Sequence, residues 1–318
     1  MELKRTLQRA ALGVVALFVL ATSSLAADAR TYHRTVAVDG VKIFYREAGD
    51  PKAPAVLLLH GFPSSSHMYR ELIPLLADRY HVVAPDLPGF GFSDAPDRAQ
   101  FKYSFEHVAQ TMTRFTELTG LDHYAVYVFD YGAPVGFRMA LAHPERIEAI
   151  VSQNGNVYED GLAPSLARLK KAHLEPTEAN RNELRSALLP AANQRRYFAG
   201  VSEADKPRVA PDGYALDDAL LARPGMAELQ LDLLVDYWSN VDQYPSYQAY
   251  LHSHKPPLLA IWGRNDTSFL PAGALAFRRD DPEAEVRLLD TGHFALETHV
   301  TEIAEAMRAF LARHVKQP

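Results

Sequence analysis

The sequence contains no cysteine, which excludes disulfide bonds, cysteine nucleophiles and thiolate metal sites. It also lacks an excess of positive charge, because 33 basic residues are outnumbered by 39 acidic ones and the formal net charge is −6. A chain with no basic stripe offers little to a nucleic-acid backbone, so we expect a small, uncharged or weakly polar ligand and no nucleic-acid partner. The 13 histidines are scattered without paired metal-ligand spacing, so neither a metal nor a cofactor is expected.

The apolar run near the N-terminus is too short to span a membrane. It covers residues 10–21, whereas a spanning helix needs about 20 apolar residues. Three basic residues precede it within the first nine positions, and the small residues Ser24 and Ala26 follow it. This order is typical of a secretory signal, so we predict that residues 1–26 are cleaved after Ala26. The mature protein would then be periplasmic or secreted, with no stable membrane association.

Strand and helix patterns alternate through the first half of the mature chain. Residues 35–49 alternate apolar and polar side chains on both sides of Asp39-Gly40, which predicts a tight antiparallel hairpin. Continuous apolar runs are typical of parallel strands covered on both faces, and they lie at 55–63, 81–91, 124–130 and 147–154. Apolar residues three and four positions apart predict helices at 68–78, 105–119 and 133–142. This alternation indicates an α/β fold with a mostly parallel, doubly wound sheet.

The alternation stops after Asn154 and resumes near Pro256. The residues between them have a helical pattern and are rich in alanine, leucine, arginine and glutamate. Two further strands and a helix follow, at 257–266, 285–293 and 302–314. We therefore expect one core domain with an inserted helical cap, the core comprising residues 30–156 and 251–318 and the cap residues 157–250.

In an open parallel sheet, ligands bind beyond the carboxyl ends of the strands, so the residues just past each strand are candidate site residues. The predicted strands end at residues 60–63, Asp86, Asp130, Asp266 and His293. Asp130, Asp266 and His293 follow the chain order of nucleophile, acid and base that this sheet topology uses for a catalytic triad. The string VFDYGAPVG, residues 128–136, predicts a tight turn that holds Asp130 in the site. For that aspartate alone, the alternative interpretation is a helix N-cap.

Several strings in this order make the chain resemble the α/β-hydrolase superfamily, and in particular its aspartate-nucleophile branch of epoxide hydrolases and haloalkane dehalogenases. The strings are HGFPSSSHMYRELIPLL, VVAPDLPGFGFSD, VFDYGAPVGF, WGRNDTSFLP and LLDTGHFALE. The resemblance implies an α/β-hydrolase fold in which Asp130 attacks carbon, Asp266 orients His293, and His293 activates water. It also implies that backbone N–H groups of Phe62 and Tyr131 form an oxyanion hole.

An aspartate suits a different reaction from that of a serine nucleophile. A carboxylate can displace a leaving group from saturated carbon, which leaves an alkyl ester on the enzyme. His293, oriented by Asp266, would then deprotonate the water that hydrolyses this ester. A non-catalytic small-molecule binding module on the same fold is the alternative from another class, but it predicts a broken triad.

The leaving group distinguishes the two resembled families. In dehalogenases an N–H donor, often tryptophan, follows the nucleophile, whereas this chain has Tyr131 there and Phe62 at the other donor position. Epoxide hydrolases use cap tyrosines to hydrogen-bond the epoxide oxygen. Tyr237 in DYWSN precedes Asp266 by a number of residues close to that between the cap tyrosine and the acid of the triad in this family. We therefore predict an epoxide hydrolase that produces a diol, with haloalkane dehalogenase by the same triad as the alternative.

The sequence leaves the second cap tyrosine open. Its candidates are Tyr158, Tyr197, Tyr244, Tyr247 and Tyr250, and for the last three we favour packing of the cap over catalysis. The predicted substrate pocket comprises His60, Tyr158, Trp238, Tyr244 and Tyr247. Hydrogen bonding that holds its own loop is the other interpretation of His60, and packing is the other interpretation of both Trp238 and Trp262. No oligomeric state is predicted.

Overall fold

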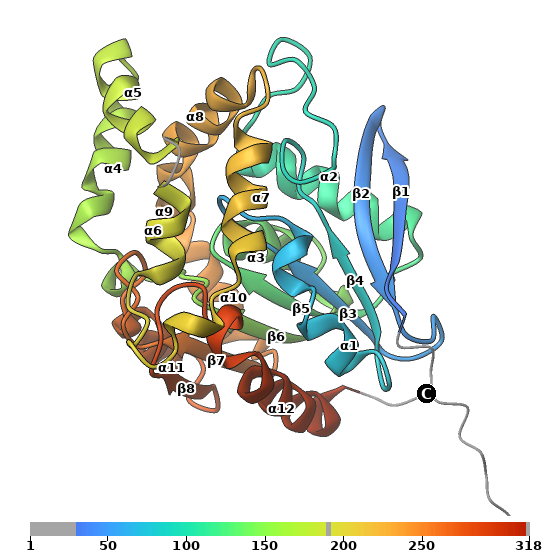
Figure 1. Cartoon of the computed structure of the whole chain (residues 1–318). Coiled ribbons are helices and arrows are strands. Elements are labelled where there is room, and N and C mark those ends of the chain that lie inside the picture. The colour runs from blue at the N-terminus through green and yellow to red at the C-terminus, as the bar shows by residue number, and fades with distance from the viewer. Residues whose placement is uncertain (1–29, 189–191, 316–318) are drawn as a thin grey trace, which may run out of the picture.

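The computed structural model describes residues 30–188 and 192–315 of the chain, so the predicted signal segment 1–26 lies outside the described residues. One sheet with the strand order β1-β2-β4-β3-β5-β6-β7-β8 runs through the molecule (Figure 1). Its strands are β1 Tyr32–Val38, β2 Val41–Ala48, β3 Ala55–Leu59, β4 His81–Pro85, β5 Tyr124–Phe129, β6 Ile147–Gln153, β7 Leu258–Gly263 and β8 Glu285–Leu289. The pairs from β4 to β8 are parallel, which confirms the predicted α/β fold with a mostly parallel sheet.

The first two strands form the predicted antiparallel hairpin. Val38 pairs with Val41, so the connection contains only two residues. Asp39 and Gly40 both have positive φ angles, of 48° and 87°. Aspartate and glycine tolerate this left-handed conformation, and the twist of such a turn matches that of the strands on either side. The hairpin extends the sheet on the side away from β8.

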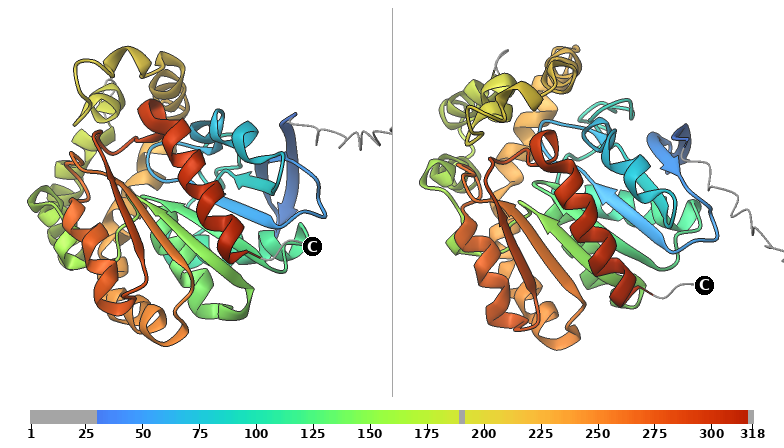
Figure 2. Two further views of the ribbon diagram at one scale, coloured as in Figure 1. Left: turned by 90° about the horizontal axis from the view of Figure 1, so that it is seen from below. Right: turned by 60° about the horizontal axis from the view of Figure 1, so that its bottom comes forward.

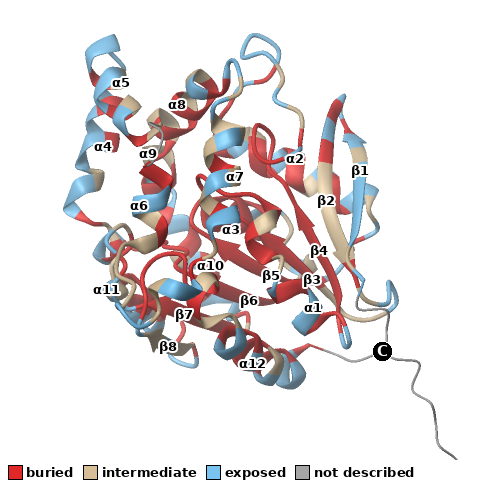
Figure 3. Cartoon of the chain, viewed as in Figure 1, coloured by how far each residue is buried: buried red, intermediate tan, exposed pale blue. Residues whose placement is uncertain are grey.

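Alternate residues of the central strands enter two separate apolar cores. Along β5, Ala125, Tyr127 and Phe129 belong to one core, while Val126 and Val128 belong to the other. Helices α1 (Leu72–Leu76) and α12 (Leu296–His314) supply the first core, and Figure 2 shows α12 crossing that face of the sheet. Helices of the second core that pack on the sheet side include α2 Phe105–Leu118, α3 Gly132–Ala142, α10 Tyr244–His254 and α11 Pro271–Asp280, and residues of several cap helices join the same core. Both faces of the central strands are therefore buried, as Figure 3 shows.

The helix predicted at 68–78 is two shorter elements in the structure. A 3₁₀ helix, η1, covers Ser66–Tyr69, and α1 begins only at Leu72. Pro74 lies in the first turn of α1, where no backbone N–H is needed for an intrahelical hydrogen bond. In one continuous helix the same proline would be an interior residue and would remove a hydrogen bond. The helices predicted at 105–119, 133–142 and 302–314 correspond to α2, α3 and part of α12.

Helices between β6 and β7 form the cap, at the upper left of Figure 1. They are α4 Ala167–Leu174, α5 Glu178–Arg185, α6 Ala192–Phe198, α7 Pro211–Leu221, α8 Met226–Asp236 and α9 Trp238–Asp242. Short 3₁₀ helices occur at η2 Pro144–Arg146, η3 Glu159–Gly161, η4 Pro164–Leu166, η5 Ser186–Leu188 and η6 Lys206–Arg208. Helix α10 extends past residue 250, where the sequence placed the end of the cap, and it packs on α3 and α11 of the core.

No helix in the two described ranges has the length and apolar character to cross a membrane.

Candidate active site

Asp130 occupies the turn between β5 and α3. Its φ angle is 48°, a left-handed conformation that costs an L-residue about 1–2 kcal/mol. Two glycines allow the chain segments around the turn to approach this closely. A Cβ atom on Gly61 would lie 2.3 Å from the Cβ of Asp130, and one on Gly132 would lie 2.1 Å from the carbonyl oxygen of Leu59. The tight turn predicted from VFDYGAPVG is therefore present between strand and helix.

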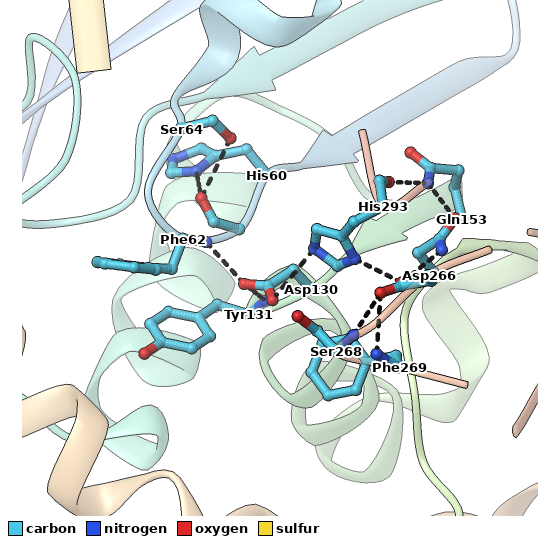
Figure 4. A network of polar contacts seen from close by, with 12 residues as sticks. His60, Phe62, Ser64, Asp130, Tyr131, Gln153, Asp266, Ser268, Phe269 and His293 are labelled. Carbon is cyan, nitrogen blue, oxygen red and sulfur yellow. Dashed lines mark hydrogen bonds and ion pairs between the residues drawn. The ribbon is translucent and has the colours of Figure 1, made fainter. Parts of the chain in front are cut away.

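The two carboxylate oxygens of Asp130 have different environments (Figure 4). Oδ1 accepts hydrogen bonds from the backbone N–H groups of Phe62 and Tyr131, both at 2.7 Å. Oδ2 lies 3.5 Å from Nε2 of His293. One oxygen is thus held by two backbone donors, while the other remains next to the imidazole and able to react.

Asp266 holds His293 through a short ion pair. Nδ1 of His293 lies 2.6 Å from Oδ2 of Asp266, whose side chain is fully buried. The other oxygen, Oδ1, accepts hydrogen bonds from the backbone N–H groups of Ser268 at 2.7 Å and Phe269 at 3.1 Å. Because these bonds fix the carboxylate, it fixes in turn the orientation of the imidazole.

The two carboxylates keep His293 protonated. Burial alone would lower the pKa of this imidazole, but Asp266 and Asp130 outweigh the effect of burial and raise the pKa to about 10. The resting site at neutral pH therefore contains an imidazolium between two aspartates. Removing either negative charge would lower the pKa of His293.

Two residues at the end of β6 support this arrangement and were not predicted from the sequence. Asn154, with a φ angle of 49°, donates from Nδ2 to Oδ2 of Asp266 at 2.6 Å and accepts from the backbone N–H of Gly263 at 3.0 Å. Gln153 donates from Nε2 to the carbonyl oxygen of His293 at 3.0 Å. Both follow an apolar run at a strand end, so the rule that identified the triad could have identified them as well.

A cavity of about 350 Å³ lies between the triad and the cap. Its core side is lined by Phe62, Asp130, Tyr131, Thr267, Ser268, Phe269 and His293. Its cap side is lined by Leu166, Arg168, Leu169, Ser186, Ala187, Ala192, Arg195, Arg196, Ala199, Leu234 and Tyr237. In the described part of the chain, no three histidine or acidic side chains are grouped so as to hold a metal ion.

Comparison with known families agrees with this topology. Residues 54–300, more than half of the chain, match the family described as alpha/beta hydrolase fold. The chain belongs to the α/β-hydrolase family. Its relatives place it near the branch of epoxide hydrolases and haloalkane dehalogenases.

Three relatives illustrate this placement of the hydrolase. An uncharacterized hydrolase of Saccharomyces cerevisiae, YNR064C, is 44% identical over 89% of this chain and 98% of its own. Haloalkane dehalogenase 2 of Mycobacterium bovis is 30% identical over 72% of this chain and 77% of its own. Epoxide hydrolase A of Mycobacterium tuberculosis is 35% identical over 47% of this chain and 43% of its own.

Tyr237 of the hydrolase follows α8 and reaches the cavity from the cap. Burial raises the pKa of its phenol well above the usual value, and the nearby Tyr244 and Asp130 raise it further. The phenol is therefore protonated at neutral pH. Tyr237 and Tyr131 are the tyrosines of the described residues that line the cavity.

The other candidate tyrosines lie outside the cavity lining. Tyr158 donates a hydrogen bond to Asp280 at 2.9 Å, and the Tyr247 hydroxyl accepts one from Arg138 at 2.6 Å. Tyr244 also lies outside the lining, but it neighbours Tyr237, which does line the cavity. Its hydroxyl accepts a hydrogen bond from Nδ2 of Asn156 at 3.2 Å. The remaining two also point elsewhere, Tyr197 donating to Asp217 at 2.7 Å and Tyr250 stacking on His254. The contacts of Tyr158 and Tyr247 reach core helices α11 and α3, that of Tyr197 joins two cap helices, and that of Tyr250 lies within α10.

His60, Trp238 and Trp262 do not line the cavity either. His60 accepts a hydrogen bond from the backbone N–H of Leu87 at 2.9 Å, and burial lowers the pKa of its imidazole. Its Nδ1 donates to the carbonyl oxygen of Gly61 at 3.0 Å, so the neutral side chain joins its own loop to the segment after β4. Trp238 lies under the ammonium group of Lys170, 5.2 Å from the ring centroid. The indole N–H of Trp262 donates to the carbonyl oxygen of Phe269 at 2.8 Å and is unavailable to a ligand.

Proposed function

We propose that this hydrolase opens small-molecule epoxides to diols through an alkyl ester on Asp130. The observation that carries the proposal is that the two oxygens of Asp130 have different surroundings. Oδ1 is held in the oxyanion hole, and Oδ2 is next to His293 and the cavity. A carboxylate held in this way can attack with one oxygen and keep the other where charge develops later.

In the proposed first step, Oδ2 of Asp130 attacks a carbon of the epoxide and the carbon–oxygen bond of the ring breaks. Tyr237 hydrogen-bonds the leaving oxygen and gives its proton to the alkoxide as that oxygen becomes the stronger base; the high pKa of Tyr237 means that the phenol carries this proton beforehand. The products of this step are a hydroxyalkyl ester on Asp130 and a phenolate at Tyr237.

Ester formation removes the negative charge of Asp130 and so activates His293 for the second step. The imidazolium loses one of the two carboxylates that raise its pKa, so it can release its proton, which through solvent restores the phenol of Tyr237 and leaves His293 neutral. Neutral His293 then takes a proton from a water molecule, which attacks the carboxyl carbon of the ester. Negative charge develops on Oδ1, where each backbone donor is worth about 3 kcal/mol. Collapse releases the diol and restores Asp130.

An epoxide suits the cavity better than a haloalkane. The side chains of Phe62 and Tyr131 line the cavity without an indole or amide N–H, and the N–H of Trp262 is engaged elsewhere. Tyr237 instead offers an O–H, which can donate a proton to an alkoxide. The second candidate is a haloalkane dehalogenase, which the 30% identity to the Mycobacterium bovis enzyme favours. Its halide would need N–H donors from the cap arginines that line the same cavity, Arg168, Arg195 and Arg196.

Intact-mass spectrometry of a His293→Gln variant tests the proposal. Without the base, the ester should persist, and an epoxide leaves an adduct of its whole mass. A haloalkane would leave its mass minus hydrogen halide, which would assign the dehalogenase reaction instead. The matched control is Asp130→Asn/His293→Gln, which should remain unmodified. If panels of terminal epoxides and haloalkanes give no adduct on folded His293→Gln protein, and the wild type turns none of them over, the binding-module alternative replaces both reactions.

A further inference from the structure

Three arginines of the cap line the cavity opposite the nucleophile. They are Arg168 of α4 and Arg195 and Arg196 of α6. Asp130 is the sole acidic residue in the same lining. Within residues 30–188 and 192–315, no carboxylate forms an ion pair with any of the three guanidinium groups, although ion pairs involve many other arginines of the protein. The cap side of the cavity is therefore positively charged and uncompensated.

Arg196 is the best fixed of these arginines. It is partly buried, and its guanidinium lies over the ring of Phe62, 5.1 Å from the centroid. It donates hydrogen bonds to Oδ1 of Asn193 and to the carbonyl oxygen of Ala187, both at 2.6 Å. These neutral acceptors hold the side chain in place without neutralising its charge. A guanidinium has five N–H donors, so donors remain for a ligand.

The electrostatic surroundings of Arg196 connect it with the site. Burial lowers the pKa of its guanidinium, and the charges of Arg168 and Arg195 lower it further, whereas Asp130 acts in the opposite direction. A guanidinium nevertheless remains charged at neutral pH. A cation that is partly withdrawn from water and faces two more cations is destabilised, and an anionic ligand would relieve this.

We propose that the substrate is an epoxide that carries a carboxylate, which Arg196 binds while the epoxide faces Asp130. This inference rests on the proposed function and specifies its substrate class. The planar guanidinium matches a carboxylate in a two-point interaction. Apolar side chains in the lining, Leu166, Leu169 and Leu234, suit a short hydrocarbon segment between the two groups. The sequence alone had favoured an uncharged or weakly polar ligand.

A matched pair of substrates tests the inference in the wild-type enzyme. The first is a terminal epoxide with a carboxylate at the end of a short alkyl chain, and the second is its primary amide, which has a similar size and no charge. At pH 7 we expect kcat/KM to be about 10- to 100-fold higher for the carboxylate, as for a hydrogen bond between charged groups. The difference should reside mainly in KM and should decrease with added salt. Equal kcat/KM values for the two would overturn the inference.

Arg196→Gln should abolish this preference by lowering kcat/KM for the carboxylate and leaving the amide nearly unchanged. Arg196→Lys keeps the charge without the planar fork and should retain part of the preference. The matched control is Arg223→Gln, which removes a cap arginine that does not line the cavity and should keep the full preference. An equal loss on both substrates in Arg196→Gln would overturn the inference, because it would place Arg196 at the leaving oxygen.

The trapping variant separates failure of this inference from failure of the proposed function. If His293→Gln is alkylated equally well by the carboxylate and the amide, the epoxide reaction stands and the carboxylate preference is wrong. If neither compound alkylates it and the wild type hydrolyses neither, the epoxide hydrolase proposal itself is wrong. Preferential alkylation by the carboxylate supports both.

Discussion

Replacing Asp266 by asparagine should separate the two steps of the proposed reaction. Asp266 accepts hydrogen bonds from four donors, namely His293 and Asn154 at Oδ2 and the backbone N–H groups of Ser268 and Phe269 at Oδ1. An asparagine has one oxygen and one NH₂ group, so its NH₂ must face one of these two pairs of donors. The substitution preserves volume and changes only the charge and the pattern of donors.

The structure determines which orientation of the asparagine costs less. If its NH₂ faces Ser268 and Phe269, two buried backbone N–H groups lose their acceptor, at about 1–3 kcal/mol each. If its NH₂ faces His293, the imidazole can accept at Nδ1 by losing the proton of that nitrogen and keeping the one on Nε2, and only the contact with Asn154 stays unfavourable. The second orientation is therefore favoured, and it leaves His293 in a tautomer that cannot take a proton from water.

We expect Asp266→Asn to lower steady-state turnover by about 10⁴-fold, as the wrong tautomer does in serine-based triads. Alkylation should be affected far less, because the oxyanion-hole contacts of Asp130 do not involve Asp266. Rapid-quench intact-mass spectrometry with an epoxide that alkylates His293→Gln should show the ester forming and then persisting. If the variant instead remained unmodified during a slow turnover, the assignment of Asp266 and His293 to ester hydrolysis would be refuted.

Three further outcomes are expected. Tyr237→Phe should slow alkylation by epoxides about 10²- to 10³-fold, as loss of a general acid does, and should leave hydrolysis of a preformed ester unchanged, both measured in single turnovers. The free energy of unfolding should be higher for the wild type than for His293→Gln, because the pKa of His293 is raised to about 10 in the folded protein. This difference should be complete below about pH 6.5 and should disappear as the pH rises towards 10. A difference in denaturant unfolding free energy that is constant from about pH 6 to 10 would contradict the ion pairs. Expressed with residues 1–26 in a Gram-negative host, the protein should be recovered from the periplasm with Ala27 as its first residue, whereas an intact N-terminus in the cytosol would exclude cleavage.

The sheet and the positions of the triad could be predicted because both depend on local pattern. Asp130 and His293 each follow an apolar run, and parallel strands bring their carboxyl ends to one edge of the sheet, so sequence position translates into spatial position. The same rule applied to the polar residues after β6 would have included Asn154. Its function was not predicted, because an asparagine has no acid or base role in a triad and acts here only by hydrogen-bonding Asp266.

The cap could not be predicted at the same level of detail. A helical pattern identifies which residues are apolar, but not which neighbour each face meets, so Tyr247 could be assigned to the pocket although its hydroxyl bonds Arg138 of α3. The position of Arg196 over Phe62 could not be predicted for the same reason, because nothing in its local sequence relates α6 to Phe62. Pro74 is a different case, because the sequence itself shows a proline inside the helix predicted at 68–78. The prediction of one continuous helix did not take into account the hydrogen bond that this proline removes.

If Asp130 is the nucleophile as proposed, the position of its Oδ1 also bears on which electrophiles the site accepts. In a serine esterase, the two backbone donors are vacant until the carbonyl oxygen of the substrate arrives, whereas here they are already bonded to a carboxylate oxygen at 2.7 Å. A carboxylic ester entering the cavity would have to displace a charged acceptor in order to be polarised. In the proposed reaction, discrimination between acyl and alkyl electrophiles would thus be set in the resting enzyme, before any recognition by the cap.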